Sequence, residues 1–202
     1  MSASGEIRQP KQKRSMEKKK KIVAAGFKLF CEKGYYNTNT AEIAKEAGVS
    51  TGIVYNYFKD KKDIFLEAIK TYVQGMMDPV YELLKEIKAP YDLTELLRQY
   101  IDIFIESHYI SKAAHEEMMA MSHMDEDVGQ YFCDFEENTA KNIVKILKNN
   151  NIYPHNADEK IHICIGMIEN LCHEIVYHKH EYMDYDIMKE EIIKSIVTML
   201  SH

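Results

Sequence analysis

The chain has 202 residues, of which 46% are hydrophobic and 29% charged, a balance typical of a globular protein that excludes a largely disordered one. Only 4 prolines and 8 glycines interrupt a composition rich in Lys, Glu, Ile, Met and Leu, which favours helix over sheet. The 4 cysteines form no CxxC pair and no apolar leader opens the chain, so we expect a cytoplasmic protein. The longest apolar or glycine run, residues 163–168, is far too short to span a membrane.

The net charge of −6 conceals an asymmetry along the chain. Residues 1–62 hold 14 lysines and arginines against 6 acidic residues, a net of +8, whereas residues 63–202 hold 12 against 26, a net of −14. A basic end on an acidic body suggests that the N-terminal part meets a polyanion. A basic tail that serves only solubility is the alternative.

The first residues, 1–16, contain almost no apolar side chains, and we expect them to form a flexible basic arm. From about Glu17 the pattern becomes helical, because apolar residues recur at i, i+3, i+7 and i+8 from Ile22. Gly34 is well placed to end this first helix.

Two further short helices follow. Asn39 as N-cap and Glu42 three residues later fit a capping box, which predicts a second helix as far as Ala47. After a turn, Ser50 can cap a third helix that ends near Phe58.

The remainder of the chain is predicted to be helical throughout. A long helix starts near Lys61, with a kink or break expected at Gly75 and Pro79. Loop signals at Ala89-Pro90 and 149–151 separate some of the later segments. Those segments are 80–88, 92–109, 111–123, 126–150, 157–181 and 184–201. With no persistent strand-like alternation, the fold class is all-α, with domains at 17–62 and 63–202.

The second and third helices have the spacing of a helix-turn-helix. A small residue at Ala44 lets the next helix cross closely, and Gly48, four positions later, permits a left-handed turn. Val54, six positions further on, supplies the apolar contact that fixes the crossing. Such a unit holds one helix rigidly so that its other face can enter a DNA major groove.

The outer face of the third helix carries groups suited to DNA. Hydroxyls at the helix start suit phosphate oxygens, and Gly52 would allow close backbone approach. Ile53 and Asn56 can reach a thymine methyl and an adenine edge. Tyr55 and Tyr57 can reach phosphate or sugar, although a core role is their alternative, as we accept for Phe58. The expected DNA-binding residues are Asn39, Thr40, Ser50, Thr51, Gly52, Ile53, Tyr55, Asn56, Tyr57 and Lys61.

The block AAGFKLFCEKGYYNTNTAEIAKEAGVSTGIVYNYFKDKKDIF contains A-x-x-x-L-F, a Gly-Tyr turn, I-A-x-x-A-G-V-S and G-x-x-Y-x-Y-F. Over Ile22 to Phe65 the chain resembles the DNA-binding domain of TetR-type (tetracycline-repressor-like) bacterial regulators. Thr51 departs from that pattern, since the position after Ser50 is often basic or a long polar residue. The departure concerns the details of operator contact.

The resemblance implies a homodimer whose C-terminal domain holds a small-molecule pocket and whose last two helices form the dimer. It further implies a repressor that an inducer releases from an inverted-repeat operator of double-stranded DNA. The corresponding dimer residues are Ile161, Ile165, Ile168, Leu171, Ile175, Ile192, Ile196 and Leu200. An intramolecular core is the alternative for this stripe.

The effector pocket is assigned to aromatic, methionine and histidine positions of the acidic domain, because Met side chains adapt to varied ligands. These residues are Tyr72, Met76, Tyr100, Phe104, His108, Met118, Met119, Met121, Tyr131 and Phe135. Ordinary helix packing is the alternative for each of them, and the ligand's charge stays open.

Other function classes have weaker support. Glu169 and His173 share a helical face beside Cys172, with His178 and His180 beyond, but no HExxH or CxxC completes a metal site. We therefore expect no metal and no cofactor, and no enzyme, since no nucleophile–base set is visible. A metal-responsive regulator, and a ligand-free helix-turn-helix protein controlled by a protein partner, remain the alternatives.

Overall fold

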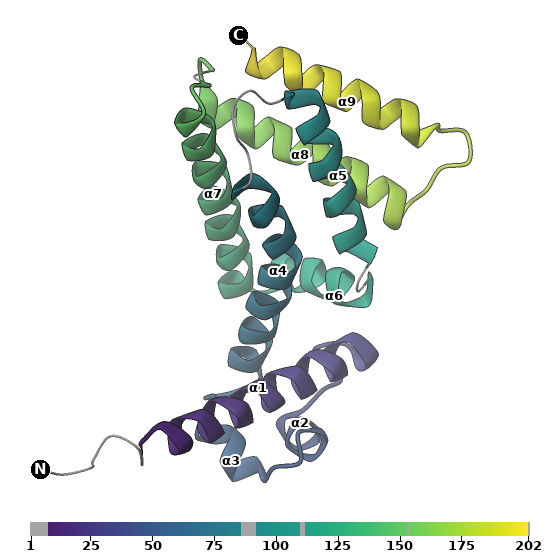
Figure 1. The fold of residues 1–202 in the computed structure, drawn as a ribbon. Helices are drawn as coiled ribbons and strands as arrows, with labels where there is room; N and C mark the ends of the chain where they lie inside the picture. The colour runs from purple at the N-terminus through teal and green to yellow at the C-terminus, as the bar shows by residue number, and fades with distance from the viewer. Residues whose placement is uncertain (1–7, 86–91, 110–111, 153, 202) are drawn as a thin grey trace, which may run out of the picture. The chain divides into compact units, whose positions relative to one another are not determined.

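The structure is a computed structural model that describes residues 8–85, 92–109, 112–152 and 154–201. Within these ranges every regular element is a helix, so the all-α prediction is confirmed (Figure 1). The helices are α1 (Arg8–Lys33), α2 (Thr40–Glu46), α3 (Thr51–Tyr55), α4 (Lys61–Lys85), α5 (Leu93–Tyr109), α6 (Lys112–Met124), α7 (Glu126–Asn149), α8 (Ala157–Val176) and α9 (Tyr185–Leu200). The predicted loop at Ala89-Pro90 lies outside the described residues.

The chain divides into two compact units. The N-terminal unit comprises Met1–Val73 with Ala113–Met121, and the C-terminal unit comprises Gln74–Lys112 with Ser122–His202. The predicted boundary at residue 62 therefore falls inside α4, and part of α6 groups with the N-terminal helices.

The N-terminal unit is built on α1, α2 and α3, with α1 packed on α2 and α2 on α3. Ile22, Ile43, Val54 and Ile64 are fully buried at its centre. Gly26 lies at a close approach, because a Cβ placed there would be 2.6 Å from Ile64 Cγ2. The tight centre follows from the sequence pattern, since each of these residues lies on the apolar face of its helix.

In the C-terminal unit, α8 is the central helix and packs against α5, α7 and α9, while α9 also contacts α5. Figure 1 shows α9 running alongside α8 after a short connection. Asp125 and Asp184 cap α7 and α9, each accepting two backbone N–H groups of the first turn. These caps provide acceptors for backbone N–H groups that have no partner within the helix at its start.

The start of α1 and the end of α8 differ from the sequence prediction. Helix α1 begins at Arg8 rather than near Glu17, so much of the expected arm is helical. The added residues are mainly lysine, glutamine and arginine, which form helix well without any apolar stripe to reveal it, and Pro10 falls in the first turn where proline is tolerated. Helix α8 ends at Val176 rather than near residue 181.

Two internal features also differ. The expected break at Pro79 is absent, because α4 runs unbroken through it. Proline removes only the N–H that would bond to the Gly75 carbonyl, and both residues are exposed, so water can serve that carbonyl. Helix α3 ends at Tyr55 rather than Phe58, because Asn56 and Tyr57 already make tighter i→i+3 bonds to Ile53 and Val54.

Candidate functional site

The turn that connects α2 to α3 has the geometry that the spacing predicted. Asn39 caps α2 by accepting from the Glu42 amide at 3.0 Å, and the Glu42 carboxylate accepts from the Asn39 amide, which completes the capping box. Gly48 has φ of +67°, a left-handed conformation that side chains resist. Val49 then donates to the Ala44 carbonyl at 2.9 Å and closes the turn.

Helix α3 has one buried and one exposed side. Val54 is fully buried, whereas Tyr55 keeps 55% of its surface exposed and Asn56 is exposed beside it. Phe58 is buried, as expected, and Ile53 is half-buried. Tyr55 therefore lies on the exposed side of the helix and not in the core.

The start of α3 presents small polar groups. Ser50 is the N-cap residue, yet its side chain makes no capping bond, so its hydroxyl can serve another partner. Gly52 is exposed, and a Cβ added there would meet nothing within 4 Å. The surface therefore leaves room for a ligand to approach the backbone at this point. Thr40 and Thr51 are half-buried, and Asn39 is exposed.

Tyr57 and Lys61 make contacts within the unit that the sequence did not indicate. The Tyr57 hydroxyl lies 3.1 Å from Ser15 Oγ on α1. The Lys61 ammonium donates to the Tyr35 carbonyl at 2.6 Å and the Thr38 carbonyl at 2.8 Å, and lies 4.2 Å from the centre of the Tyr35 ring. Burial lowers the pKa of Lys61. Its predicted phosphate contact stays a prediction beside this observed structural role.

Polar residues absent from the sequence prediction support the loop before α2. Thr38 is buried, and its hydroxyl donates to the Gly34 carbonyl at 2.9 Å and the Leu29 carbonyl at 3.2 Å. The Glu117 carboxylate on α6 accepts from the Tyr35 amide. Periodicity cannot reveal such bonds, because they depend on where a single polar atom meets the backbone.

The C-terminal unit contains a narrow cavity of about 80 Å³ with an almost wholly apolar lining. Helices α5 and α8 supply most of the wall, and α4, α7 and α9 complete it. The lining residues are Leu84, Leu93, Leu96, Leu97, Tyr100, Ile143, Leu147, Ile161, Cys164, Ile165, Ile168, Ile196 and Leu200. Burial raises the pKa of Tyr100, so its phenol stays neutral.

The structure distributes the predicted pocket residues over several places, and only Tyr100 lines this cavity. Phe104 stacks on Tyr100 at 5.9 Å, and Met76 is buried in the same unit. Tyr131 and Phe135 are half-buried on α7. The leucines at 93, 96 and 97 were the signal that could have located the cavity, because they share one helical face with Tyr100 at i, i+3, i+4 and i+7.

The other predicted pocket residues belong to the N-terminal unit. Tyr72 lines a separate groove of about 630 Å³ between α1 and α4, where it stacks on Phe27 at 5.6 Å. Met118 and Met121 are buried in the N-terminal unit, outside this groove, and Met119 is half-buried. Their placement on α6 could not be assigned to a unit from helical periodicity alone.

Most of the residues predicted for the dimer are buried within the single chain, where they form its core. Six of the eight are less than 9% exposed, and only Ile165 and Ile175 are half-buried; the six are Ile161, Ile168, Leu171, Ile192, Ile196 and Leu200. The apolar stripe thus serves intramolecular packing, as the alternative had it. The outer side of α8 and α9 instead exposes Ile163 by 52% and Ile187 by 61%.

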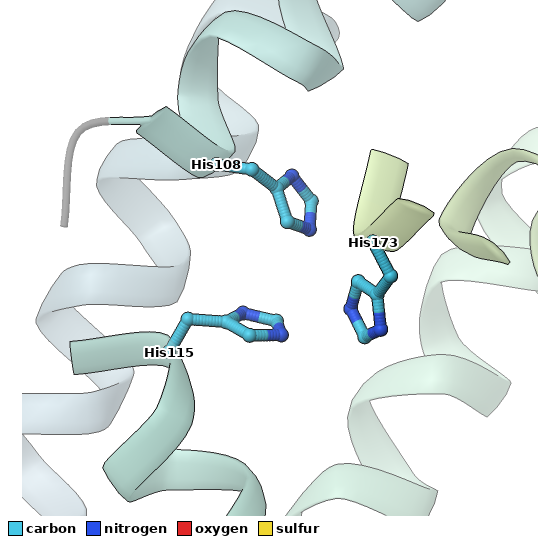
Figure 2. Close-up of side chains that lie close together, drawn as sticks. All are labelled: His108, His115 and His173. Atoms are coloured by element: carbon cyan, nitrogen blue, oxygen red, sulfur yellow. The ribbon is translucent and has the colours of Figure 1, made fainter. Parts of the chain in front are cut away.

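Histidines meet inside the C-terminal unit in an arrangement that the sequence did not predict. His108 on α5 and His173 on α8 have ring centres 5.8 Å apart (Figure 2). Of the residues considered from the sequence, His180 instead pairs with Glu174 at 3.3 Å, and His178 is exposed. Burial raises the pKa of Glu169 to about 7 and that of the Cys172 thiol to about 12. None of the helices in the described ranges is long and apolar enough to cross a membrane.

A capped helix-turn-helix with an exposed third helix defines a helical DNA-binding protein. A family model described as "Bacterial regulatory proteins, tetR family" matches residues 22–68. The HTH-type transcriptional regulator HbdR of Aromatoleum sp. (strain CIB) is 40% identical over 84 residues, 36% of this chain and 37% of HbdR. The regulator AcrR of Shigella flexneri is 32% identical over 116 residues, 57% of this chain and 53% of AcrR. Residues 22–68 are therefore similar to the helix-turn-helix domain of the TetR family of transcriptional regulators.

A solved TetR-family structure from Syntrophomonas wolfei str. Goettingen has the same fold, with a TM-score of 0.69. It covers 93% of this chain and 96% of its own, at 23% identity. The similarity to the two curated relatives spans about two fifths to one half of their length. The full-length likeness thus concerns the fold, and the likeness in sequence to helix-turn-helix regulators concerns the N-terminal part of the chain.

Proposed function

We propose that the protein acts in the cytoplasm as a homodimeric repressor that leaves an inverted-repeat operator when a small apolar inducer binds its C-terminal unit. The observation that carries the proposal is the rigidly held α3, with Val54 buried on one side and Tyr55 and Asn56 exposed on the other. Two copies of such a helix in a two-fold dimer match half-sites about one helical turn apart.

The operator contacts are tested on a duplex selected by the purified full-length protein. Asn56→Ala removes an amide suited to an adenine edge, and Tyr55→Ala removes a phenol suited to the backbone. We expect each variant to lose roughly 10-fold or more in affinity, since a good base contact contributes about 1–3 kcal/mol. Tyr36→Ala is the matched control, because Tyr36 is 63% exposed in the same unit but lies outside α2 and α3. Unchanged titrations for both variants would reject α3 as the reading helix.

The dimer is assigned to the outer side of α8 and α9 rather than to their buried stripe. Ile163, Gly166 and Asn170 lie on one exposed side of α8, at i, i+3 and i+7. No atom lies within 4 Å of where a Cβ would stand at Gly166, so another backbone could approach there. On α9, Ile187 begins a similar exposed row that continues through Ser195.

Light scattering after size-exclusion chromatography tests this assignment. The double variant Ile163→Glu with Ile187→Glu should be monomeric at concentrations where the wild type is dimeric, because it places four carboxylates in the isologous interface. Met124→Glu is the control, since Met124 is also an exposed apolar residue, at 65%, on another helix. A double variant that remains dimeric contradicts the interface.

The inducer class follows from the cavity lining. No charged side chain lines the cavity between α5 and α8, so a neutral apolar ligand suits it better than an ionic one. At about 80 Å³ it is far below an ordinary ligand pocket, so a larger inducer must separate the lining side chains. By linkage, an inducer that binds the DNA-free shape more tightly weakens DNA binding by the same factor.

A series of n-alkanols tests the cavity by thermal denaturation and by release of bound operator. The melting temperature should rise with chain length until the cavity is full, because a bound ligand stabilises the folded state. Leu97→Phe fills the cavity and should remove this response while operator binding persists. A response that Leu97→Phe leaves unchanged places the ligand elsewhere.

A further inference from the structure

His108 is held at the end of α5 in a defined protonation form. It is 1% exposed, and its Nδ1 lies 2.8 Å from the Phe104 carbonyl oxygen. A carbonyl can only accept, so Nδ1 carries the proton and Nε2 carries the lone pair. This backbone contact also fixes the ring orientation, as the outer hydrogen bond of a metal-bound histidine does.

His173 on α8 completes the pair. A ring nitrogen of His108 lies within 4.8 Å of a ring nitrogen of His173, and the two ring planes meet at 64°. Tyr177, one turn further along α8, donates its hydroxyl to the His108 carbonyl at 3.3 Å and packs on His173 at 5.6 Å. The two elements are thereby tied together at the pair.

We propose that His108 and His173 are ligands of a divalent late transition metal ion, for which Zn²⁺ is the natural choice. Two nitrogens bound to one tetrahedral Zn²⁺ at about 2.0–2.1 Å lie roughly 3.4 Å apart, so small ring rotations suffice from the observed separation. Imidazole donors suit Zn²⁺, Ni²⁺ or Cu²⁺, whereas Mg²⁺ and Ca²⁺ prefer oxygen donors.

The test uses the full-length protein after chelator treatment and without DNA, so its outcome is independent of operator binding. Calorimetric titration with ZnCl₂ should show one ion per chain, and Co²⁺ in its place should give visible absorption bands typical of imidazole coordination. His108→Ala and His173→Ala should each weaken Zn²⁺ binding by at least about tenfold. Circular dichroism tests whether each variant is folded. A variant that is not folded is replaced by the glutamine substitution at the same position, His108→Gln or His173→Gln.

His162→Ala is the matched control, because His162 lies on α8 as His173 does but is exposed. The absence of saturable binding, or equal affinity in the wild type and both pair variants, overturns the site. Loss of binding in His162→Ala alone assigns the ion to the surface and also overturns it.

Discussion

The two units use their buried polar groups differently. In the N-terminal unit, Thr38 and Lys61 donate to backbone carbonyls, and the capping box on Asn39 holds the next helix. In the C-terminal unit, a nearly all-apolar cavity accompanies a buried His108 and a half-buried Glu169, and burial shifts the pKa of each toward its neutral form. Presenting a helix to DNA requires a backbone held in one shape, whereas admitting a ligand requires side chains that can move apart.

The largest effect should come from the tightest contact of the N-terminal unit. Gly26→Ala places a methyl group 2.6 Å from Ile64 Cγ2, and Ile64 is fully buried. We expect the free energy of unfolding to fall by about 3 kcal/mol, as for overpacking in a close-packed core. Gly75→Ala in α4 is the control, since its methyl meets nothing within 4 Å and should raise stability by about 0.5–1 kcal/mol. Urea denaturation measures both, and equal midpoints would show that this unit is not rigid.

The second effect is a pH dependence of the C-terminal unit. Burial and the nearby Glu136 raise the pKa of Glu169 from 4.5 to about 7 in the folded chain. As the pH rises from 4.5 to 7 the unfolded chain ionises first, so stability falls across that window and the loss is complete above it. Glu169→Gln should abolish the fall, which is on the order of 2–3 kcal/mol, when melting is measured from pH 5 to 8. Glu106→Gln, at an exposed site on α5, should leave the curve unchanged.

The third effect distinguishes the two roles of Lys61. Lys61→Met keeps the apolar stem but leaves the Tyr35 and Thr38 carbonyls without their ammonium donor. We expect a loss of about 1.5–3 kcal/mol in stability, the usual contribution of a hydrogen bond to a charged group. Lys59→Met, at an exposed site, should change stability little. If Lys61→Met melts like the wild type but binds operator poorly, the phosphate role predicted from the sequence is the correct one.

The same contrast explains how much the sequence could predict. The capping box, the glycine turns and Val54 depend on neighbours within a few positions, so local pattern located them by residue number. The cavity and the histidine pair depend on which faces of α5 and α8 meet, and many helical registers satisfy the same apolar stripe. The stripe on α8 and α9 therefore indicated burial without naming the partner, and most of its residues are buried within the single chain. Helix α1 was missed before Glu17 because a lysine-rich helix has no apolar stripe to reveal it.

The smallest effect concerns Gly52, where helix stability favours alanine but close approach of DNA favours glycine. Glycine inside a helix costs about 0.5–1 kcal/mol relative to alanine, so Gly52→Ala should raise the melting temperature slightly. The added methyl meets nothing within 4 Å in the free protein, so no steric clash opposes this gain. Bound DNA would change that, because a backbone approached closely by a phosphate has no room for a side chain. We therefore expect Gly52→Ala to be more stable yet to bind operator less tightly in a gel-shift titration. Tighter or equal binding would mean that DNA does not approach α3 at its first turn, and would move the contact surface toward Tyr55 and Asn56.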